Sequence, residues 1–328
     1  MKYGIQIGPD PVRTYGMYVS SLTTSFFLCA KCKNRLRVSI KYSQENVYTS
    51  TFSIIMDGEI YDFPQVATSL GYERHEQIGK GAFGTLYRVT RDERTYAGKF
   101  MKNTITNLNE VTVERALPRH PSLLKYIDAF SIGSRGLILI LELFSGETLY
   151  NLAEILTQKD ILNIAIASFQ GLAFIHSHII AHRDIKLENI MYDVATKTTK
   201  IIDFGLACFA DNIKTVYAGS VVYWPPEFPP PIDYEIKNMD RDKKVSFDGY
   251  KRADVWALGL VLYECVNGSP IEAYSKEQLV EMNECGTFLY PRVDYNKVEI
   301  PKLYSIISQA LTSDPSVRPT AIDISKTE

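Results

Sequence analysis

The sequence predicts an α+β protein with two lobes, of which the first is rich in β-strands. The chain has 328 residues, more than one small core needs, and 45% of them are hydrophobic, which suits a globular protein. A glycine-rich stretch at residues 78–89 fits two strands joined by a hairpin. Residues 136–144 form an apolar run of the length of one buried strand, too short to cross a membrane.

Charge and cysteine usage narrow the class of protein. The chain carries 36 basic and 38 acidic residues, a formal net charge of −2, so no broad surface for nucleic acid or membranes is expected. Its five cysteines are odd in number and scattered, which fits a reducing compartment. Residues 1–12 contain Gly, Asp and Pro and do not resemble a signal peptide. We therefore expect a soluble intracellular protein of the cytoplasm, with the nucleus as an open alternative.

The segment His182–Asn189 is the most informative in the chain. It reads His-Arg-Asp-Ile-Lys-Leu-Glu-Asn, and an Asp-Phe-Gly triplet begins at Asp203. Asp184 can accept a proton at neutral pH, while Asn189 and Asp203 offer an uncharged and an anionic oxygen to a hard cation such as Mg²⁺. The triplet alone is typical of a turn after a buried strand. Together with the Asp184 loop, it indicates phosphoryl transfer.

From about Tyr72 to its end, the chain resembles the eukaryotic protein kinase family, serine/threonine type. The resemblance implies a bilobal α+β fold with a small β-rich N-lobe at residues 72–143 and a larger, mostly helical C-lobe at residues 144–328. It also implies ATP and Mg²⁺ as cofactors, bound between the lobes, and protein substrates with Ser or Thr acceptors.

The resemblance assigns roles within the loop. Asp184 is the catalytic base, Lys186 contacts the γ-phosphate, and Asn189 and Asp203 hold the metal. Lys186 is typical of serine/threonine kinases, and Gly219-Ser220 resembles their Gly-Thr pair.

The glycine-rich segment has the family's Gly-x-Gly-x-x-Gly spacing. By itself this pattern could be a Rossmann turn, but it leads into a β-like run at residues 85–89 instead of a helix. By resemblance, the residues that cover the phosphates are Ile78, Gly79, Gly81, Ala82, Phe83 and Gly84.

Lys99 follows Gly84 by fifteen positions and stands in Tyr-Ala-Gly-Lys-Phe, where the family has its Val-Ala-Ile-Lys strand. It is expected to anchor the α and β phosphates and to pair with Glu110, with Glu114 as the alternative. Glu110 follows Lys99 by eleven positions, fewer than the family uses, so we expect this helix to be short or displaced. A surface helix with ordinary ion pairs is the other reading of both glutamates.

The adenine site is expected where the apolar run 136–144 ends. By resemblance, Leu141 is the gatekeeper, and the backbone of Glu142 and Phe144 pairs with the adenine edge. The residues expected to enclose the ring are Leu86, Ala97 and Met191, all of which could equally be core. Glu147 is expected to meet the ribose or a basic substrate residue.

Three further residues are expected to hold the C-lobe together. Glu227 ends a Pro-Pro-Glu triplet where the family has Ala-Pro-Glu, and it should pair with Arg318. Asp254 should brace the catalytic loop from the start of a buried helix. Pairs of this kind fix geometry more than they add stability.

The roles of two segments remain open: the segment that contains Thr215 and Tyr217, and residues 228–253. Arg183 precedes the base and is expected to clamp a phosphate on Thr215 or Tyr217, although both can be ordinary loop residues. Residues 228–253 are about twice the family's usual length and are expected to form a surface loop, either a tolerated insertion or an influence on substrate choice.

Residues 1–71 lie outside the resemblance and receive no function. Alternating apolar runs at residues 36–40 and 52–56 predict short antiparallel strands in a small β-rich segment. Cys29 and Cys32 have the spacing of half a zinc site, but the other cysteines form no second pair, so zinc is not expected.

Two other functions compete with that of a protein kinase. A pseudokinase that binds nucleotide as a scaffold would lack the base, the metal-binding Asp or the strand lysine, and this chain has all three. A kinase for small molecules is disfavoured because the Pro-Pro-Glu triplet and Gly219-Ser220 resemble a peptide-docking segment.

Overall fold

The computed structural model describes most of the chain after residue 62 and three short strands before it. The described ranges are 63–81, 84–132, 136–211, 218–228, 245–268 and 294–327, with the backbone of 23–28, 35–40 and 54–55. The chain divides into two compact units. Unit 1 comprises Met1–Leu108 and Tyr126–Leu143, and unit 2 comprises Asn109–Lys125 and Phe144–Glu328.

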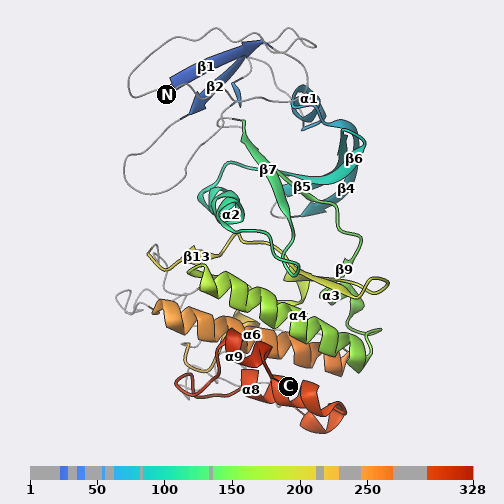
Figure 1. Ribbon diagram of the computed structural model, residues 1–328, viewed down its shortest axis with the longest axis vertical. Coiled ribbons are helices and arrows are strands. Elements are labelled where there is room, and N and C mark those ends of the chain that lie inside the picture. Colours follow the sequence, from blue (N-terminus) through green and yellow to red (C-terminus); the bar gives the residue numbers. More distant parts are fainter. Residues whose placement is uncertain are drawn as a thin grey trace, which may run out of the picture. The chain divides into compact units, whose positions relative to one another are not determined.

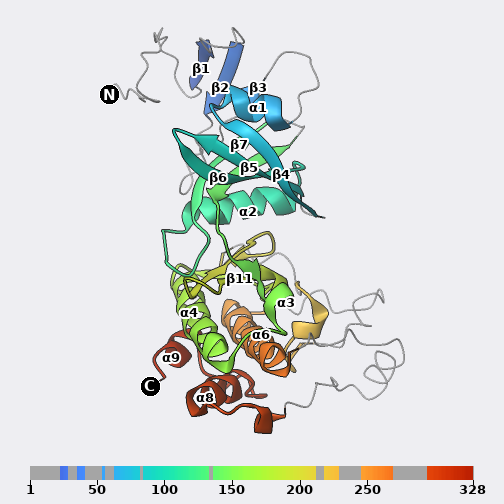
Figure 2. The same ribbon diagram turned by 90° about the vertical axis from the view of Figure 1, so that its right-hand side faces the viewer.

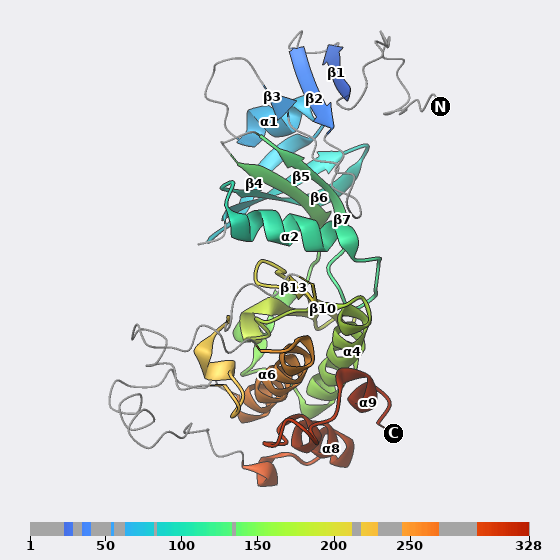
Figure 3. The same ribbon diagram turned by 90° about the vertical axis from the view of Figure 1, so that its left-hand side faces the viewer.

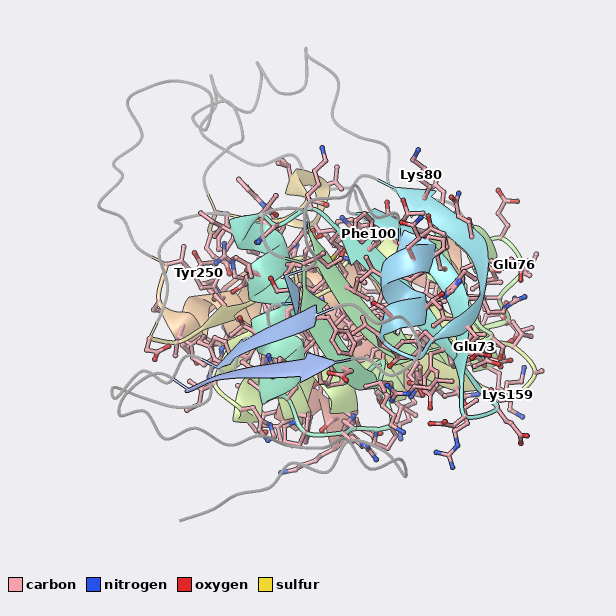
Figure 4. The ribbon with its side chains drawn as sticks, turned by 90° about the horizontal axis from the view of Figure 1, so that it is seen from above. Glu73, Glu76, Lys80, Phe100, Lys159 and Tyr250 are labelled. Carbon is pink, nitrogen blue, oxygen red and sulfur yellow. The ribbon has the colours of Figure 1, made fainter. Side chains whose placement is uncertain are left out.

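Unit 1 is built on a five-stranded antiparallel sheet with the strand order β4-β5-β6-β8-β7. Strands β4, β5, β6 and β7 of this sheet are labelled in Figure 1. The strands are β4 (Glu73–Gly81), β5 (Gly84–Arg91), β6 (Arg94–Met101), β7 (Tyr126–Ser131) and β8 (Leu137–Glu142). β8 is the apolar run that the sequence marks as a buried strand, and five of its six residues are buried. Glu73, Glu76 and Lys80 all come from β4, which is an edge strand (Figure 4).

Because side chains alternate along a strand, the register divides this sheet into two faces. Gly98 lies opposite Tyr87 and Ile140, and these three belong to one face. Lys99 lies opposite Leu86 and Leu139 on the other.

The helix α1 (Phe63–Ser69) covers the face that carries Gly98. Its residues Phe63, Val66 and Ala67 are at most 2% exposed and share one apolar cluster with Ile138 and Ile140 of β8. The helix precedes residue 72, where the sequence places the boundary of the N-lobe. The core of unit 1 therefore draws on residues from both sides of that boundary.

Residues 23–55 contribute a separate three-stranded antiparallel sheet. Its strands are β1 (Thr23–Leu28), β2 (Arg35–Ile40) and β3 (Ile54–Ile55), and β1 and β2 run side by side in Figure 2. The antiparallel strands predicted at residues 36–40 and 52–56 are thereby confirmed. Cys29 and Cys32 lie outside the described residues.

Unit 2 is mostly helical. Its helices include α3 (Leu149–Leu152), α4 (Gln158–Ser177), α6 (Phe247–Asn267), α8 (Pro301–Ala310) and α9 (Ala321–Ser325). The helix α2 (Ile105–Ala116) begins in unit 1 and ends in unit 2. α4 packs against α6 and α9, and α8 packs against α6 (Figure 3). The two units bear out the predicted α+β architecture.

The helix α4 starts at a capping box, in which Thr157 and Asp160 satisfy each other's backbone N–H groups. The Asp160 carboxylate also accepts hydrogen bonds of 2.8 Å from Lys197 Nζ and from the hydroxyl of Tyr192. Burial alone would raise the pKa of Asp160, but these hydrogen bonds outweigh burial and lower it. Asp160 thus ties the start of α4 to the strand that carries Tyr192.

Several short strands in unit 2 flank the predicted catalytic loop, residues 182–189. β9 (Glu147–Thr148), β11 (Ile190–Asp193) and β12 (Thr198–Ile201) form one small sheet, while β10 (Ile180–Ala181) pairs with β13 (Cys208–Phe209). The one-turn helices η2 (Leu187–Asn189), η3 (Val221–Tyr223) and η4 (Tyr295–Lys297) connect longer elements.

The loop expected at residues 228–253 is shorter than predicted, because α6 begins at Phe247. The side chain of Ser246 accepts a hydrogen bond from the backbone N–H of Gly249 and so caps the helix. Asp248 in the first turn pairs with Lys251. Asp254 therefore lies two turns inside α6 and not at its start. Residues 229–244 lie outside the described part of the chain.

Within the described residues, no helix combines the length and apolar character that a membrane span requires.

Candidate active site

The catalytic loop follows β10 and ends in η2, so both of its ends are held by backbone hydrogen bonds. The carboxylate of Asp184 is at the centre of this loop and is 7% exposed. Its Oδ2 lies 2.9 Å from Lys186 Nζ and accepts a hydrogen bond of 3.1 Å from Asn189 Nδ2. Three of the residues that the sequence singles out are therefore in direct contact.

The other carboxylate oxygen of Asp184 contacts Ser220. Asp184 Oδ1 accepts two hydrogen bonds of 3.1 Å, one from the backbone N–H and one from the hydroxyl of Ser220. The Lys186 ammonium lies 3.4 Å from the same hydroxyl. The sequence pointed to Ser220 only as a sign of substrate type, and its spacing of 36 residues from Asp184 gave no hint of this contact.

Gly219 allows Ser220 to approach. Its φ of 93° lies in the left-handed region, and a Cβ at this position would overlap the carbonyl oxygen of Arg183. Any other residue here would separate Ser220 from the catalytic loop.

Asp254 braces the backbone that leads into Asp184. Its Oδ2 accepts hydrogen bonds of 2.8 Å from the backbone N–H of His182 and 2.9 Å from His176 Nε2, and its Oδ1 accepts one of 2.7 Å from the backbone N–H of Arg183. Arg183 has a φ of 68°, which residues other than glycine seldom adopt. The bracing role predicted for Asp254 is confirmed.

Asp203 also has a left-handed backbone, with a φ of 65°, and its Oδ1 accepts a hydrogen bond of 3.1 Å from the N–H of Gly205. The preceding residue, Ile202, donates its N–H to the carbonyl oxygen of Asn189 at 3.0 Å. This bond ties the segment that carries Asp203 to the loop that carries Asn189.

The donor set of these two residues suits a hard cation. Asn189 uses its Nδ2 group for hydrogen bonds to the backbone and side chain of Asp184, which leaves its amide oxygen as a ligand. Asp203 adds carboxylate oxygen. Two protein oxygens, with the rest of an octahedral shell from water and phosphate, are the ligand set that Mg²⁺ takes in phosphoryl-transfer sites. In the described part of the chain, no His, Cys, Asp and Glu side chains gather in a group of three that could hold a metal by themselves.

Asn109 is a residue that sequence reasoning missed. Its Nδ2 lies 2.7 Å from the carbonyl oxygen of Ala207, 3.2 Å from that of Gly205 and 3.4 Å from that of Phe204. The amide therefore clamps the backbone that follows Asp203. Its position directly before Glu110, the predicted partner of Lys99, was the available signal.

Glu110 and Glu114 are 3% and 4% exposed, so the reading of both as surface residues is wrong. Both lie on α2, whose 12 residues make an ordinary helix of about three turns, and the expectation of a short helix is wrong as well.

In unit 1, the hairpin predicted from the glycine-rich segment is present. β4 and β5 are antiparallel and Gly81 lies opposite Gly84, while Ala82 and Phe83 lie outside the described residues. Gly84 has a φ of 138°, and a Cβ on it would overlap the carbonyl oxygen of Phe100. The hairpin can therefore turn close to β6 only with a glycine at this position.

Three of the predicted adenine-site residues of unit 1, Leu86, Ala97 and Leu141, lie on the face of the sheet that carries Lys99. Leu86 lies opposite Lys99, and Ala97 lies opposite Leu141. Gly79 and the 36% exposed Ile78 precede them on β4, and Glu142 ends β8.

In unit 2, Phe144 is half-buried, and Met191 pairs with Thr148 across β11 and β9. Glu147 is exposed, and its carboxylate accepts a hydrogen bond of 3.2 Å from Asn151 Nδ2.

The ion pair predicted between Glu227 and Arg318 is confirmed. Arg318 is fully buried and binds Glu227 through two parallel hydrogen bonds of 2.7 and 2.9 Å. Its remaining N–H groups donate to the backbone carbonyl oxygens of Arg252, Thr312 and Ser313, and its guanidinium stacks over Trp256. All five donors of a buried cation are thereby used.

Arg183 stacks its guanidinium over Tyr250, 4.8 Å from the centre of that ring. Thr215 and Tyr217, the candidate phosphate acceptors, lie outside the described residues. Nearby, burial raises the pKa of the Cys208 thiol, so this cysteine is a poor nucleophile at neutral pH.

The arrangement in unit 2 can position a hydroxyl group and accept its proton. A buried carboxylate is held by an ammonium, an amide and a hydroxyl, and two oxygen ligands for a metal lie on the adjoining segments.

Comparison with known proteins agrees with this chemistry. A sequence model described as the protein kinase domain matches residues 72–328. The chain is similar to the probable serine/threonine-protein kinase mkcE of Dictyostelium discoideum, with 28% identity over 256 residues that cover 74% of this chain and 33% of that protein.

Two more relatives have the same identity of 28%. The cell cycle serine/threonine-protein kinase CDC5/MSD2 of Saccharomyces cerevisiae aligns over 273 residues, 77% of this chain and 36% of that protein. The serine/threonine-protein kinase Nek8 of Danio rerio aligns over 280 residues, also 77% of this chain and 36% of that protein. The chain thus spans about a third of the length of the curated relatives it matches.

Proposed function

The chain belongs to the protein kinase family, and from this premise we propose that it transfers the γ-phosphate of Mg-ATP to Ser and Thr hydroxyls of protein substrates. The observation that carries the proposal is the network around Asp184, in which Lys186, Asn189 and Ser220 contact both oxygens of one buried carboxylate. A scaffold protein has no need for such an arrangement, because its polar groups could face water at no cost.

The residues present fit the two cofactors. Asn189 and Asp203 would hold Mg²⁺, and Lys99 with the backbone of the β4–β5 hairpin would hold the phosphates of ATP. When bound, Mg-ATP supplies the phosphoryl group and neutralises the charge on its oxygens.

The chain's own residues position the acceptor. Asp184 accepts a hydrogen bond from the substrate hydroxyl and takes up its proton. The Lys186 ammonium, already 2.9 Å from Asp184, stabilises negative charge that develops beside the carboxylate during transfer. Ser220 fixes the orientation of the carboxylate from the opposite side.

The relatives' names support serine and threonine as acceptors, as do Lys186 and the Gly219-Ser220 pair. Glu147 and Glu188 are both exposed in unit 2 and could attract basic residues of a substrate. We propose a basic consensus on this ground, and a peptide array would define it. An intracellular, cytoplasmic location is also proposed, and the free, buried thiols of Cys208 and Cys265 fit a reducing compartment.

Transfer of radiolabelled γ-phosphate to a generic basic protein tests the activity. The wild-type chain should label Ser and Thr, and Asp184→Asn should cut turnover by about 10²- to 10⁴-fold while ATP binding is kept. Asp203→Ala should abolish transfer and weaken the Mg²⁺ dependence of ATP binding. A wild-type chain that binds ATP and transfers no phosphate would instead be a pseudokinase.

A further inference from the structure

Strand β6 has a position without a side chain directly before Lys99. The family has an Ile in the position before this lysine, and this chain has Gly98. Gly98 is buried, so the missing side chain leaves no opening to solvent. Another group must fill the space, since interiors close-pack and an apolar void is costly.

Phe63 of α1 fills this space. A Cβ built on Gly98 would lie 2.8 Å from Phe63 Cζ, closer than two carbon atoms can approach. The ring of Phe63 also stacks on Tyr87, with ring centres 4.1 Å apart and planes 13° apart. Tyr87 is the cross-strand neighbour of Gly98. Phe63 therefore covers both members of one β5–β6 pair.

The next pair along the same two strands is Leu86 with Lys99. Consecutive positions of a strand face opposite sides of the sheet, so Phe63, which packs on the side of Gly98, does not contact the side chain of Lys99. It can act on Lys99 only through the backbone of β6, by holding that strand in place beside β5.

We infer that Phe63 is a positioning residue for nucleotide binding: it replaces, from a separate helix, the side chain that β6 lacks at Gly98, and so fixes the strand that presents Lys99. The inference rests on the proposed function, because it takes Lys99 as the anchor of ATP. It makes α1 a working part of the N-lobe, although the helix lies before residue 72, where the family match begins.

A double substitution separates this role from simple packing. In the full chain, Phe63→Ala empties the space over Gly98, and Gly98→Ile restores from β6 the side chain that the family uses. Gly98→Ile alone should clash with the Phe63 ring. The pair should therefore compensate, and each single substitution should not.

Val66 and Thr68 supply matched controls on the same helix. Val66 is 1% exposed and belongs to the same apolar cluster, but it supplies none of the three atoms nearest to a Cβ built on Gly98. Val66→Ala should lower the melting temperature, and Gly98→Ile should not rescue it. Thr68 is exposed, and Thr68→Ala should leave both the melting temperature and ATP binding unchanged.

The measurements are the dissociation constant of a fluorescent ATP analogue, the KM for ATP, kcat and the melting temperature. Phe63→Ala should weaken ATP binding and raise the KM on the order of tenfold, with a smaller change in kcat. The Phe63→Ala, Gly98→Ile double variant should return the dissociation constant to within about twofold of wild type.

Three outcomes would overturn the inference. Phe63→Ala could bind ATP as wild type does, the double variant could bind no better than the weaker single variant, or Gly98→Ile could rescue Val66→Ala equally well. A wild-type chain that binds no ATP analogue would overturn the proposed function first and this inference with it. Wild-type binding with an unchanged Phe63→Ala variant would overturn this inference alone.

Discussion

Asp254 is the side chain on which the geometry of the catalytic loop most depends. It is 2% exposed and accepts hydrogen bonds from the backbone N–H groups of His182 and Arg183 and from His176 Nε2. Asp254→Ala would leave two backbone donors without acceptors in the interior. Asp254→Asn keeps the shape of the side chain but has one acceptor oxygen, so it can satisfy only one of the two.

The expected loss follows from these contacts. A buried N–H without a partner costs about 1–3 kcal/mol, so Asp254→Ala should lose about 2–6 kcal/mol and Asp254→Asn about half of that. Arg183 adds to the effect, because its φ of 68° costs ~1–3 kcal/mol and persists only where neighbours hold it. Against a usual total of about 5–15 kcal/mol, the Ala variant is close to unfolding and the Asn variant should fold.

Asp254→Asn is therefore the variant to assay. We expect its melting temperature to fall by about 2–4 °C for each kcal/mol lost, and its kcat to fall about tenfold or more because Asp184 follows the released backbone. Asp248→Asn is the control, since Asp248 lies on the same helix with its side chain 61% exposed and, among the described residues, forms ion pairs with Lys251 and Arg252. It should change stability by no more than about 1 kcal/mol and leave kcat alone. The reasoning fails if Asp254→Asn melts and turns over as the control does.

Three other predictions concern the surroundings of the site. Gly219→Ala should lower kcat strongly and the melting temperature only slightly, because the added methyl meets the Arg183 carbonyl and moves Ser220 away from the base. Steady-state kinetics and a thermal melt measure the two effects. A large fall in melting temperature with little change in kcat would mean that the glycine only supports the fold. Asn109→Ala should weaken the Mg²⁺ dependence of ATP binding, since it releases two carbonyl groups of the Asp-Phe-Gly triplet and that of Ala207 just after it. A magnesium titration of ATP affinity checks this. Because the pKa of Asp160 is lowered in the folded protein, its ionised carboxylate stabilises the fold above the ordinary pKa of 3.8, and this stability is lost as the pH falls toward the folded pKa. Below about pH 4, the melting temperature of Asp160→Asn should therefore fall less steeply with pH than that of wild type.

The residues that the sequence identified are those whose chemistry is specified by type and spacing. Asp184, Lys186 and Asn189 lie within six residues of one another, and a single loop brings them together. Glu227 and Arg318 are 91 residues apart, yet they were predictable because the resemblance supplied the pairing. In a local motif such as the Asp184 loop, the short chain between the residues itself brings them together.

The residues that the sequence missed act through packing between distant segments. Nothing in the spacing of Phe63 and Gly98 shows that a ring on one fills the space on the other, because that match depends on how α1 lies on the sheet. The start of α6 was missed for a different reason. The charged segment before Ser246 hid a serine cap, and a single capping residue is a weak signal inside a polar stretch.

The Asp184 network also limits how a substrate can enter. A carboxylate has about four lone-pair positions, and here Oδ1 accepts two bonds from Ser220 while Oδ2 accepts from Asn189 and Lys186. A substrate hydroxyl must therefore replace one of these donors. The Asn189 amide is fixed by a second bond to the Asp184 carbonyl oxygen, and the Ser220 N–H is fixed by the backbone. The Ser220 hydroxyl is the donor that a rotation about its C–O bond releases, while its oxygen keeps the hydrogen bond of 3.4 Å that it accepts from the Lys186 ammonium. An incoming Ser or Thr hydroxyl would thus take the place of a hydroxyl of its own kind, at the oxygen of Asp184 that faces Ser220.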